Sequence, residues 1–249
     1  MNKLRAHWRN RAGFALLVAL GLTVTDRGFA ENSAIIPVAR TNASWIQRHE
    51  SMNQKARQGH IDLIYVGDSI VEHYENQGKE VWAHYYVGRN ALNLGISGDR
   101  TEHVLWRLDH GNIDGISPKL AIVMIGQNNG GYNTGEEIAE GVVAIIQKLR
   151  AKLPTTKILL LGIFQRREKP TPEREVLAKA NEISSKLANG KNVFYLDIND
   201  VFVRPDGTIP RSLMYDFEHP TPLGHRRWAE VIEPKVAELM GDQPLPPMP

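Results

Sequence analysis

The sequence predicts one α/β domain, a three-layer α/β/α sandwich around a five-stranded parallel sheet. Two observations predict it. Apolar runs of strand length alternate with longer segments of helical period, and this alternation implies parallel strands joined by helical crossovers. Within each run the apolar residues are consecutive, as in strands buried on both faces. The chain has 249 residues, which fits one such domain because a single core serves up to about 250 residues.

Each expected element has a definite place in the chain. The clearest helix is residues 136–153, where apolar residues recur at spacings of three and four and Pro154 follows. The other expected helices are residues 45–58, 102–109, 172–187 and 222–240. The expected strands are residues 63–66, 91–94, 120–125, 158–161 and 193–196.

Composition narrows the class of protein. Hydrophobic residues make up 42% and charged residues 23%, the balance of an ordinary globular protein. The formal net charge is +2, and residues 1–30 hold five basic residues against one acidic one, so the remainder is near −2. That balance gives no electrostatic reason to expect nucleic acid or an acidic membrane as a partner. The chain has no cysteine, so disulfides and thiolate metal sites are excluded.

The two ends of the chain differ from its middle. Residues 1–30 are typical of a signal peptide: a basic stretch, an apolar run over 14–24 and small residues at Gly28 and Ala30. The run is shorter than the ~20 residues that span a bilayer, so we expect export to a periplasm or the cell exterior without a stable membrane anchor. The alternative is an uncleaved anchor or a basic tail. Residues 31–60 are expected to pack on the domain at 61–240, and the proline-rich residues 241–249 to be disordered.

In such sheets, ligands bind beyond the carboxyl ends of the strands. Gly67-Asp68-Ser69-Ile70 follows the first expected strand. A serine at that point can present its hydroxyl at the sheet edge, and glycine permits a tight backbone there. The alternative is an ordinary helix cap.

The loops after the next two strands could supply hydrogen-bond donors. In the segment 95–101, a glycine could let a backbone N–H face an oxyanion; the alternative is a plain loop with Thr101 as a helix cap. In the segment 126–131, an asparagine side chain could donate to developing negative charge. The alternative there is turn chemistry, for which Asn and Gly are the usual residues.

A carboxylate lies three residues before a histidine in Asp216-Phe-Glu-His219. Such a pair can orient an imidazole and free its other nitrogen to take a proton from a serine. The remaining histidines show no ligand spacing with His219, so no metal is expected. Together the four segments supply a nucleophile, two donors and a base with its orienting carboxylate.

The same segments, in this order, resemble the blocks of the SGNH (GDSL-like) hydrolases over residues 61–235. Ile70 stands where the name-giving motif has Leu, and Asn129 where many members have Asp. Residues 93–108 and 126–129 resemble the branch that contains the platelet-activating-factor acetylhydrolase catalytic subunits, with Gln127 in place of its Thr.

The resemblance implies a flavodoxin-like sandwich, no cofactor, and hydrolysis of small acyl esters, often acetyl. It implies Ser69 as nucleophile, His219 as base and Asp216 as its orienting group. It further implies an oxyanion hole built by the N–H groups of Ser69 and Gly98 and by Asn128. Asp68 and Asn129 are expected to contact the substrate.

The expected substrate is a small-molecule or glycan ester, with a carbohydrate ester favoured. A lipid-directed acetylhydrolase or lysophospholipase is the alternative within the same chemistry. A catalytically inactive binding module on this fold is a further alternative. A nucleotide or flavin binder is disfavoured because no phosphate-binding loop is present. The sequence predicts no oligomeric state.

Overall fold

The computed structural model describes residues 31–249, and the predicted signal peptide lies outside them. The described residues form one sheet of five parallel strands in the order β2-β1-β3-β4-β5. This confirms the predicted fold class. The strands are β1 (Leu63–Gly67), β2 (Ala91–Gly95), β3 (Leu120–Met124), β4 (Lys157–Leu161) and β5 (Val193–Leu196).

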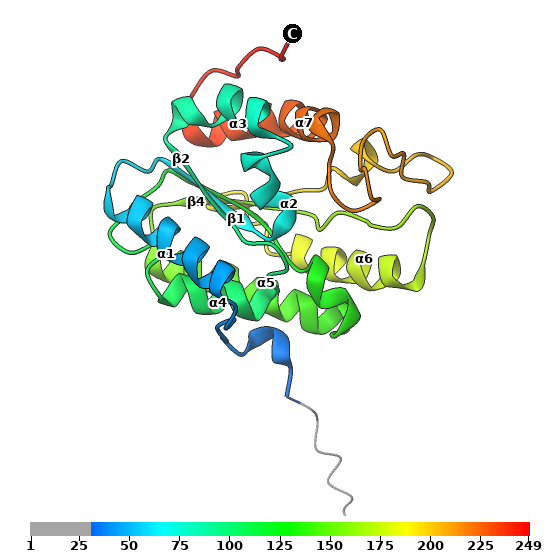
Figure 1. The fold of residues 1–249 in the computed structure, drawn as a ribbon, viewed down its shortest axis with the longest axis horizontal. Coiled ribbons are helices and arrows are strands. Elements are labelled where there is room, and N and C mark those ends of the chain that lie inside the picture. Colours follow the sequence, from blue (N-terminus) through cyan, green and yellow to red (C-terminus); the bar gives the residue numbers. More distant parts are fainter. Residues whose placement is uncertain (1–30) are drawn as a thin grey trace, which may run out of the picture. The chain divides into compact units, whose positions relative to one another are not determined.

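Helices cover both faces of the sheet (Figure 1). One face carries α1 (Ala43–Arg57), α4 (Thr101–Asp109), α5 (Gly135–Lys152) and α6 (Pro172–Ser185). The other carries α2 (Ser69–Glu72), α3 (Lys79–Tyr85) and α7 (Pro222–Met240). Short 3-10 helices complete the chain: η1 (Ser33–Ile35), η2 (His73–Glu75), η3 (Val87–Arg89), η4 (Gln127–Gly131) and η5 (Asn199–Val201).

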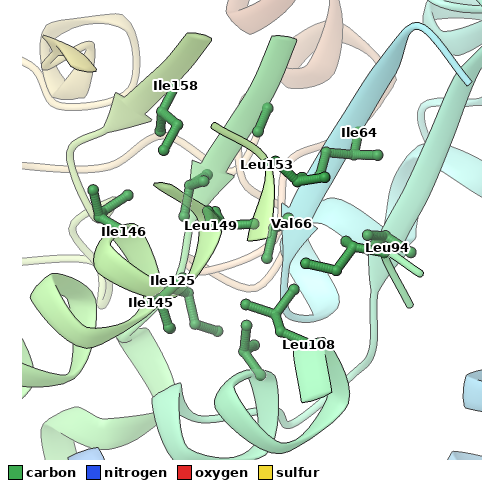
Figure 2. Close-up of a cluster of buried hydrophobic side chains, with 14 of the residues drawn as sticks. Ile64, Val66, Leu94, Leu108, Ile125, Ile145, Ile146, Leu149, Leu153 and Ile158 are labelled. Atoms are coloured by element: carbon green, nitrogen blue, oxygen red, sulfur yellow. The ribbon is translucent and has the colours of Figure 1, made fainter. Parts of the chain in front are cut away.

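The core lies on the two faces of the sheet because successive strand residues point in opposite directions. Ile64 and Val66 pack with Leu94, Leu108 and the apolar face of α5 (Figure 2). Leu63 and Tyr65 pack on the opposite side, against α3 and Trp228 of α7. Within residues 31–249, no helix combines the length and the apolar character needed to cross a bilayer.

The segments flanking the central domain are in contact with it. Trp45 of α1 is buried in the core. At the other end, the Leu245 N–H donates to Glu233 at 2.8 Å, and Arg226 donates to the Pro249 carbonyl at 2.7 Å. The proline-rich tail, for which disorder is predicted, thus contacts α7 in the structure. The tail forms no helix or strand of its own. Its backbone groups are instead hydrogen-bonded to side chains of α7.

The register of the sheet aligns the carboxyl ends of β1, β2 and β3, the three strands that lead into the site. Gly67 at the end of β1 is paired with Gly95 of β2 and with Met124 of β3. The loops that follow these three strands therefore start side by side at one edge.

Candidate active site

Ser69 is the first residue of α2 and lies two residues after β1 ends at Gly67. Asp68 is the N-cap, and its Oδ1 accepts a hydrogen bond from the Ile70 N–H at 3.0 Å. Gly67 makes the tight turn possible, because a Cβ there would lie 2.4 Å from Val71 Cγ2 and 2.7 Å from the Met124 carbonyl oxygen. The turn places the Ser69 hydroxyl at the carboxyl edge of the sheet.

His219 and Asp216 reach this hydroxyl from the segment before α7. His219 Nε2 lies 2.8 Å from Ser69 Oγ, and His219 Nδ1 lies 2.7 Å from Asp216 Oδ2. The other Asp216 oxygen accepts from the His219 backbone N–H at 2.7 Å. The structure thus joins the three residues predicted from sequence in one hydrogen-bonded chain.

The electrostatics of the pair suit an imidazole that gains a proton. Burial raises the pKa of Asp216, but the hydrogen bonds from the His219 backbone and ring outweigh it and bring the pKa below its ordinary value. Asp216 is therefore ionised at neutral pH. An ionised carboxylate on Nδ1 fixes the ring's tautomer and stabilises its protonated form.

Surface interactions hold the segment that carries His219. Phe217 has a φ of +65°, which only its surroundings can impose on a bulky residue. Its carbonyl accepts from the Arg167 N–H at 2.9 Å. The Arg166 guanidinium lies 3.2 Å from Glu218 and 3.3 Å from Glu173. These contacts tie the segment to the loop after β4.

The three predicted oxyanion donors come from the ends of β1, β2 and β3. Gly98 has a φ of +77°, a conformation that favours glycine. Neither the Ser69 nor the Gly98 amide takes part in the turn and cap hydrogen bonds of residues 31–249. The Asn128 amide donates to the Asp99 carbonyl at 3.0 Å, and its only other acceptor among these residues is Asp68 Oδ2, at a long 3.4 Å. The side chain is thus anchored through one N–H and weakly engaged through the other.

A buried ion pair positions the loop of Gly98, and sequence reasoning missed it. Asp99 is fully buried and accepts from Trp45 Nε1 at 2.7 Å and from Arg107 Nε at 2.8 Å. Arg107 is also fully buried and donates to the carbonyl of Leu94 at 3.0 Å. The loop is thereby fixed to both α1 and the end of β2. The spacing Asp99-x₇-Arg107 was the only signal, and it differs from the three- or four-residue spacing of ion pairs within a helix.

The structure does not support the predicted substrate contacts of Asp68 and Asn129. Asp68 is 1% exposed, and burial raises its pKa to about 7. Asn129 is 0% exposed; its oxygen accepts from the Thr101 N–H and its amide donates to Glu102 and Asn133. Both side chains point inward, where they form hydrogen bonds with helix N-termini and loops. They therefore support the site rather than face the substrate.

Two further histidines lie near the site. The His73 ring is 4.8 Å from the His219 ring, and burial followed by the charge of His219 lowers the pKa of His73. His225 of α7 is fully buried, and burial lowers its pKa to about 4. No group of three or more metal-ligating side chains is found in residues 31–249.

The chain belongs to the GDSL-like lipase/acylhydrolase family, whose model matches residues 65–227. It is a carboxylic ester hydrolase, as predicted. Its relatives include platelet-activating factor acetylhydrolase IB subunit alpha2 of Homo sapiens, 36% identical over 218 residues that cover 86% of this chain and 94% of the relative. Subunit alpha1 of Bos taurus is 33% identical over 228 residues, covering 89% of this chain and 97% of the relative.

Solved structures show the same fold at lower identity. A GDSL-like lipase from Bacteroides thetaiotaomicron is 15% identical with a TM-score of 0.61 and covers 77% of this chain and 97% of its own. An acetylxylan esterase from Geobacillus stearothermophilus is 18% identical with a TM-score of 0.56 and covers 76% of this chain and 97% of its own. At these identities the likeness concerns the fold.

Proposed function

We propose that this protein is a serine esterase that hydrolyses small acyl esters, acetyl esters foremost, through an acyl-enzyme intermediate. The observation that carries the proposal is the hydrogen-bonded chain from Ser69 Oγ through His219 to Asp216, at 2.8 and 2.7 Å. Both distances lie within the ~2.6–3.2 Å reach that nucleophile and base require.

In this mechanism Ser69 Oγ attacks the ester carbonyl carbon while His219 Nε2 accepts the hydroxyl proton. Asp216 holds the ring and stabilises the imidazolium. The tetrahedral oxyanion is held by the N–H groups of Ser69 and Gly98 and by the Asn128 amide. His219 then returns its proton to the departing alcohol. A water molecule, deprotonated by His219, releases the acyl group by the same route.

Asn128 has to reorganise little to take part. Its amide already donates to Asp99 and needs to exchange only the 3.4 Å contact with Asp68 for one with the oxyanion. Catalytic hydrogen bonds are often long before substrate arrives and tighten in the reacting complex.

We propose a carbohydrate ester as the substrate, with export directed by residues 1–30. The support is the signal-like pattern of that segment and the fold shared with an acetylxylan esterase. A lipid acetyl ester is the second candidate, because relatives that are 36% identical are named for platelet-activating factor.

The test is hydrolysis of p-nitrophenyl acetate, butyrate and octanoate by the protein from Glu31 onward, beside Ser69→Ala. We expect activity that falls with acyl length and is lost in the variant, while circular dichroism shows an intact fold. An active Ser69→Ala protein would remove Ser69 from the mechanism. Activity that rises with acyl length would favour the lipid candidate.

A further inference from the structure

We infer that two exposed tyrosines, Tyr132 and Tyr215, form stacking subsites for sugar rings on either side of Ser69. This inference rests on the proposed function and deepens it, since it assigns the alcohol part of the substrate to an oligosaccharide. Among the tyrosine, tryptophan and phenylalanine side chains of residues 31–249, only these two are exposed, at 74% and 39%. The other rings of these three residue types are buried or partly buried.

Tyr132 adjoins the oxyanion side of the site. It caps η4, the short helix that also carries Asn128. The Arg100 guanidinium lies 4.4 Å from the centre of its ring, a cation–π contact, and Arg100 is itself paired with Glu102. Arg100 directly follows Asp99, whose carbonyl accepts from Asn128. The tyrosine is therefore fixed across the two loops that carry the Gly98 and Asn128 donors.

Tyr215 adjoins the base side. It directly precedes Asp216, and its ring is stacked on that of His219, with centroids 5.9 Å apart and an interplanar angle of 19°. Its N–H donates to the His219 carbonyl at 3.1 Å. The ring of Tyr215 thus continues the surface of the catalytic imidazole outward to solvent.

A surface hollow beside Tyr132 could accommodate a chain of sugar residues. It has a volume of about 610 Å³ and lies between η4 and the first turns of α5 and α6. Its polar lining includes Asn133, Thr134, Glu136 and Glu175. The hollow is shallow and open to solvent, as a site for an extended chain of sugars would be. Both helices begin at the carboxyl edge of the sheet, so the hollow is on the same edge as Ser69.

The chemistry of this surface fits a sugar better than an acyl chain. A pyranose ring presents C–H groups on its faces, and these carry slight positive charge that an aromatic face attracts. Its hydroxyl groups need donors and acceptors, which the amide, hydroxyl and carboxylate groups of the hollow supply. The lining of the hollow is more apolar than polar, which suits the faces of a sugar ring, but it includes the carboxylates of Glu136 and Glu175, which a lipid chain could not pair.

The test compares two substrates across a set of variants. For each protein, kcat/KM is measured on acetylated xylo-oligosaccharides and on p-nitrophenyl acetate, and the ratio of the two is taken. We expect the ratio to fall roughly three- to tenfold in Tyr132→Ala, the change that aromatic stacking carries. Tyr132→Phe and Tyr215→Phe should keep the ratio, since the ring face is retained. Val87→Ala is the matched control: Val87 is 59% exposed and precedes β2, at the opposite edge of the sheet.

A second measurement separates binding from chemistry. Calorimetric titration of Ser69→Ala with the same oligosaccharides should show binding that weakens when Tyr132→Ala is added. If the ratio in Tyr132→Ala stays within twofold of wild type, or if the wild type hydrolyses p-nitrophenyl acetate but not the oligosaccharides, the subsites are refuted while the esterase stands. If Ser69-dependent hydrolysis is absent on both substrates, the proposed function itself fails.

Discussion

The two halves of the candidate site are held in place in different ways. On the oxyanion side, the loop of Gly98 is fixed by Asp99, Arg107 and Trp45, all of them buried. On the base side, the segment of Asp216 and His219 is held by partly exposed ion pairs and a strained Phe217. The difference teaches that substitutions on the base side should affect activity alone, whereas substitutions beneath the oxyanion side should also affect stability.

The largest effect is expected from His219→Ala. Without its base, Ser69 remains a protonated, weak nucleophile, and kcat should fall by about 10⁴-fold or more. The melting temperature should stay within a few degrees, because the side chain is near the surface and its removal leaves no buried charge unpaired. Steady-state kinetics and calorimetry measure the two quantities. A variant that retained the wild-type pH–rate profile would mean that another base acts, and a large loss of stability would contradict the comparison.

Arg107→Ala should have the next largest effect, this time on stability. It removes the buried guanidinium that pairs with Asp99 and leaves only the partly exposed Arg40 guanidinium, at 3.6 Å, which costs about 3–5 kcal/mol. Urea unfolding would measure this loss. The control is Arg226→Ala, which removes a half-exposed arginine paired with Glu230 and should cost no more than about 1 kcal/mol. Equal losses in the two variants would show that burial of the Asp99 pair is unimportant.

Asn128→Ala tests whether the donors on the oxyanion side contribute to catalysis. Loss of one such donor lowers kcat by about 10²–10³-fold. KM should change little, because the contact strengthens only as charge develops. The comparison would be sharpened by Asn129→Ala, which should lower stability because it uncaps α4. An unchanged kcat in Asn128→Ala would remove that residue from the site.

The smallest effects concern pH, and they differ in sign between His225 and Asp68. Burial lowers the pKa of His225 to about 4, so between pH 6.5 and 4 only the unfolded chain binds the proton, and stability is lost as pH falls. Burial raises the pKa of Asp68 to about 7, so between about pH 4 and 7 the folded chain retains a proton that the unfolded chain loses, and stability falls as pH rises.

Two variants separate these contributions. His225→Gln should flatten the loss of stability toward acid, by up to about 1.4 kcal/mol per pH unit. Asp68→Asn should gain stability relative to wild type as pH rises toward 7. Urea unfolding between pH 4.5 and 7.5 measures both. Parallel pH curves for wild type and either variant would show that the substituted group does not shift its pKa on folding.

Much of the fold could be predicted because the five strands are short, consecutive apolar runs. Ser69, Asp216 and His219 could be predicted because they follow strand ends or precede the last helix, and because the segments resemble a family. The helices α2 and α3 could not, since four and seven residues contain too few turns to show a period. The burial of Asn129 could not either, because an asparagine within a glycine-rich turn is usually exposed. Arg107 gathers partners from distant parts of the chain, and their proximity exists only after folding.

The position of β1 within the sheet has a consequence for how the enzyme inactivates. β1 is hydrogen-bonded to a strand on each side along its whole length, and Ser69 lies two residues beyond its end. The segment of His219 belongs to no ladder of the sheet and is joined through the isolated Met214–Pro220 bridge, local turns and its contacts with Arg166 and Arg167. Segments with few buried contacts open at lower free energy than core strands. Amide hydrogens around residues 214–220 should therefore exchange well before those of 63–67. On warming, we expect activity to disappear reversibly, through separation of base from nucleophile, several degrees below the temperature at which the sheet melts.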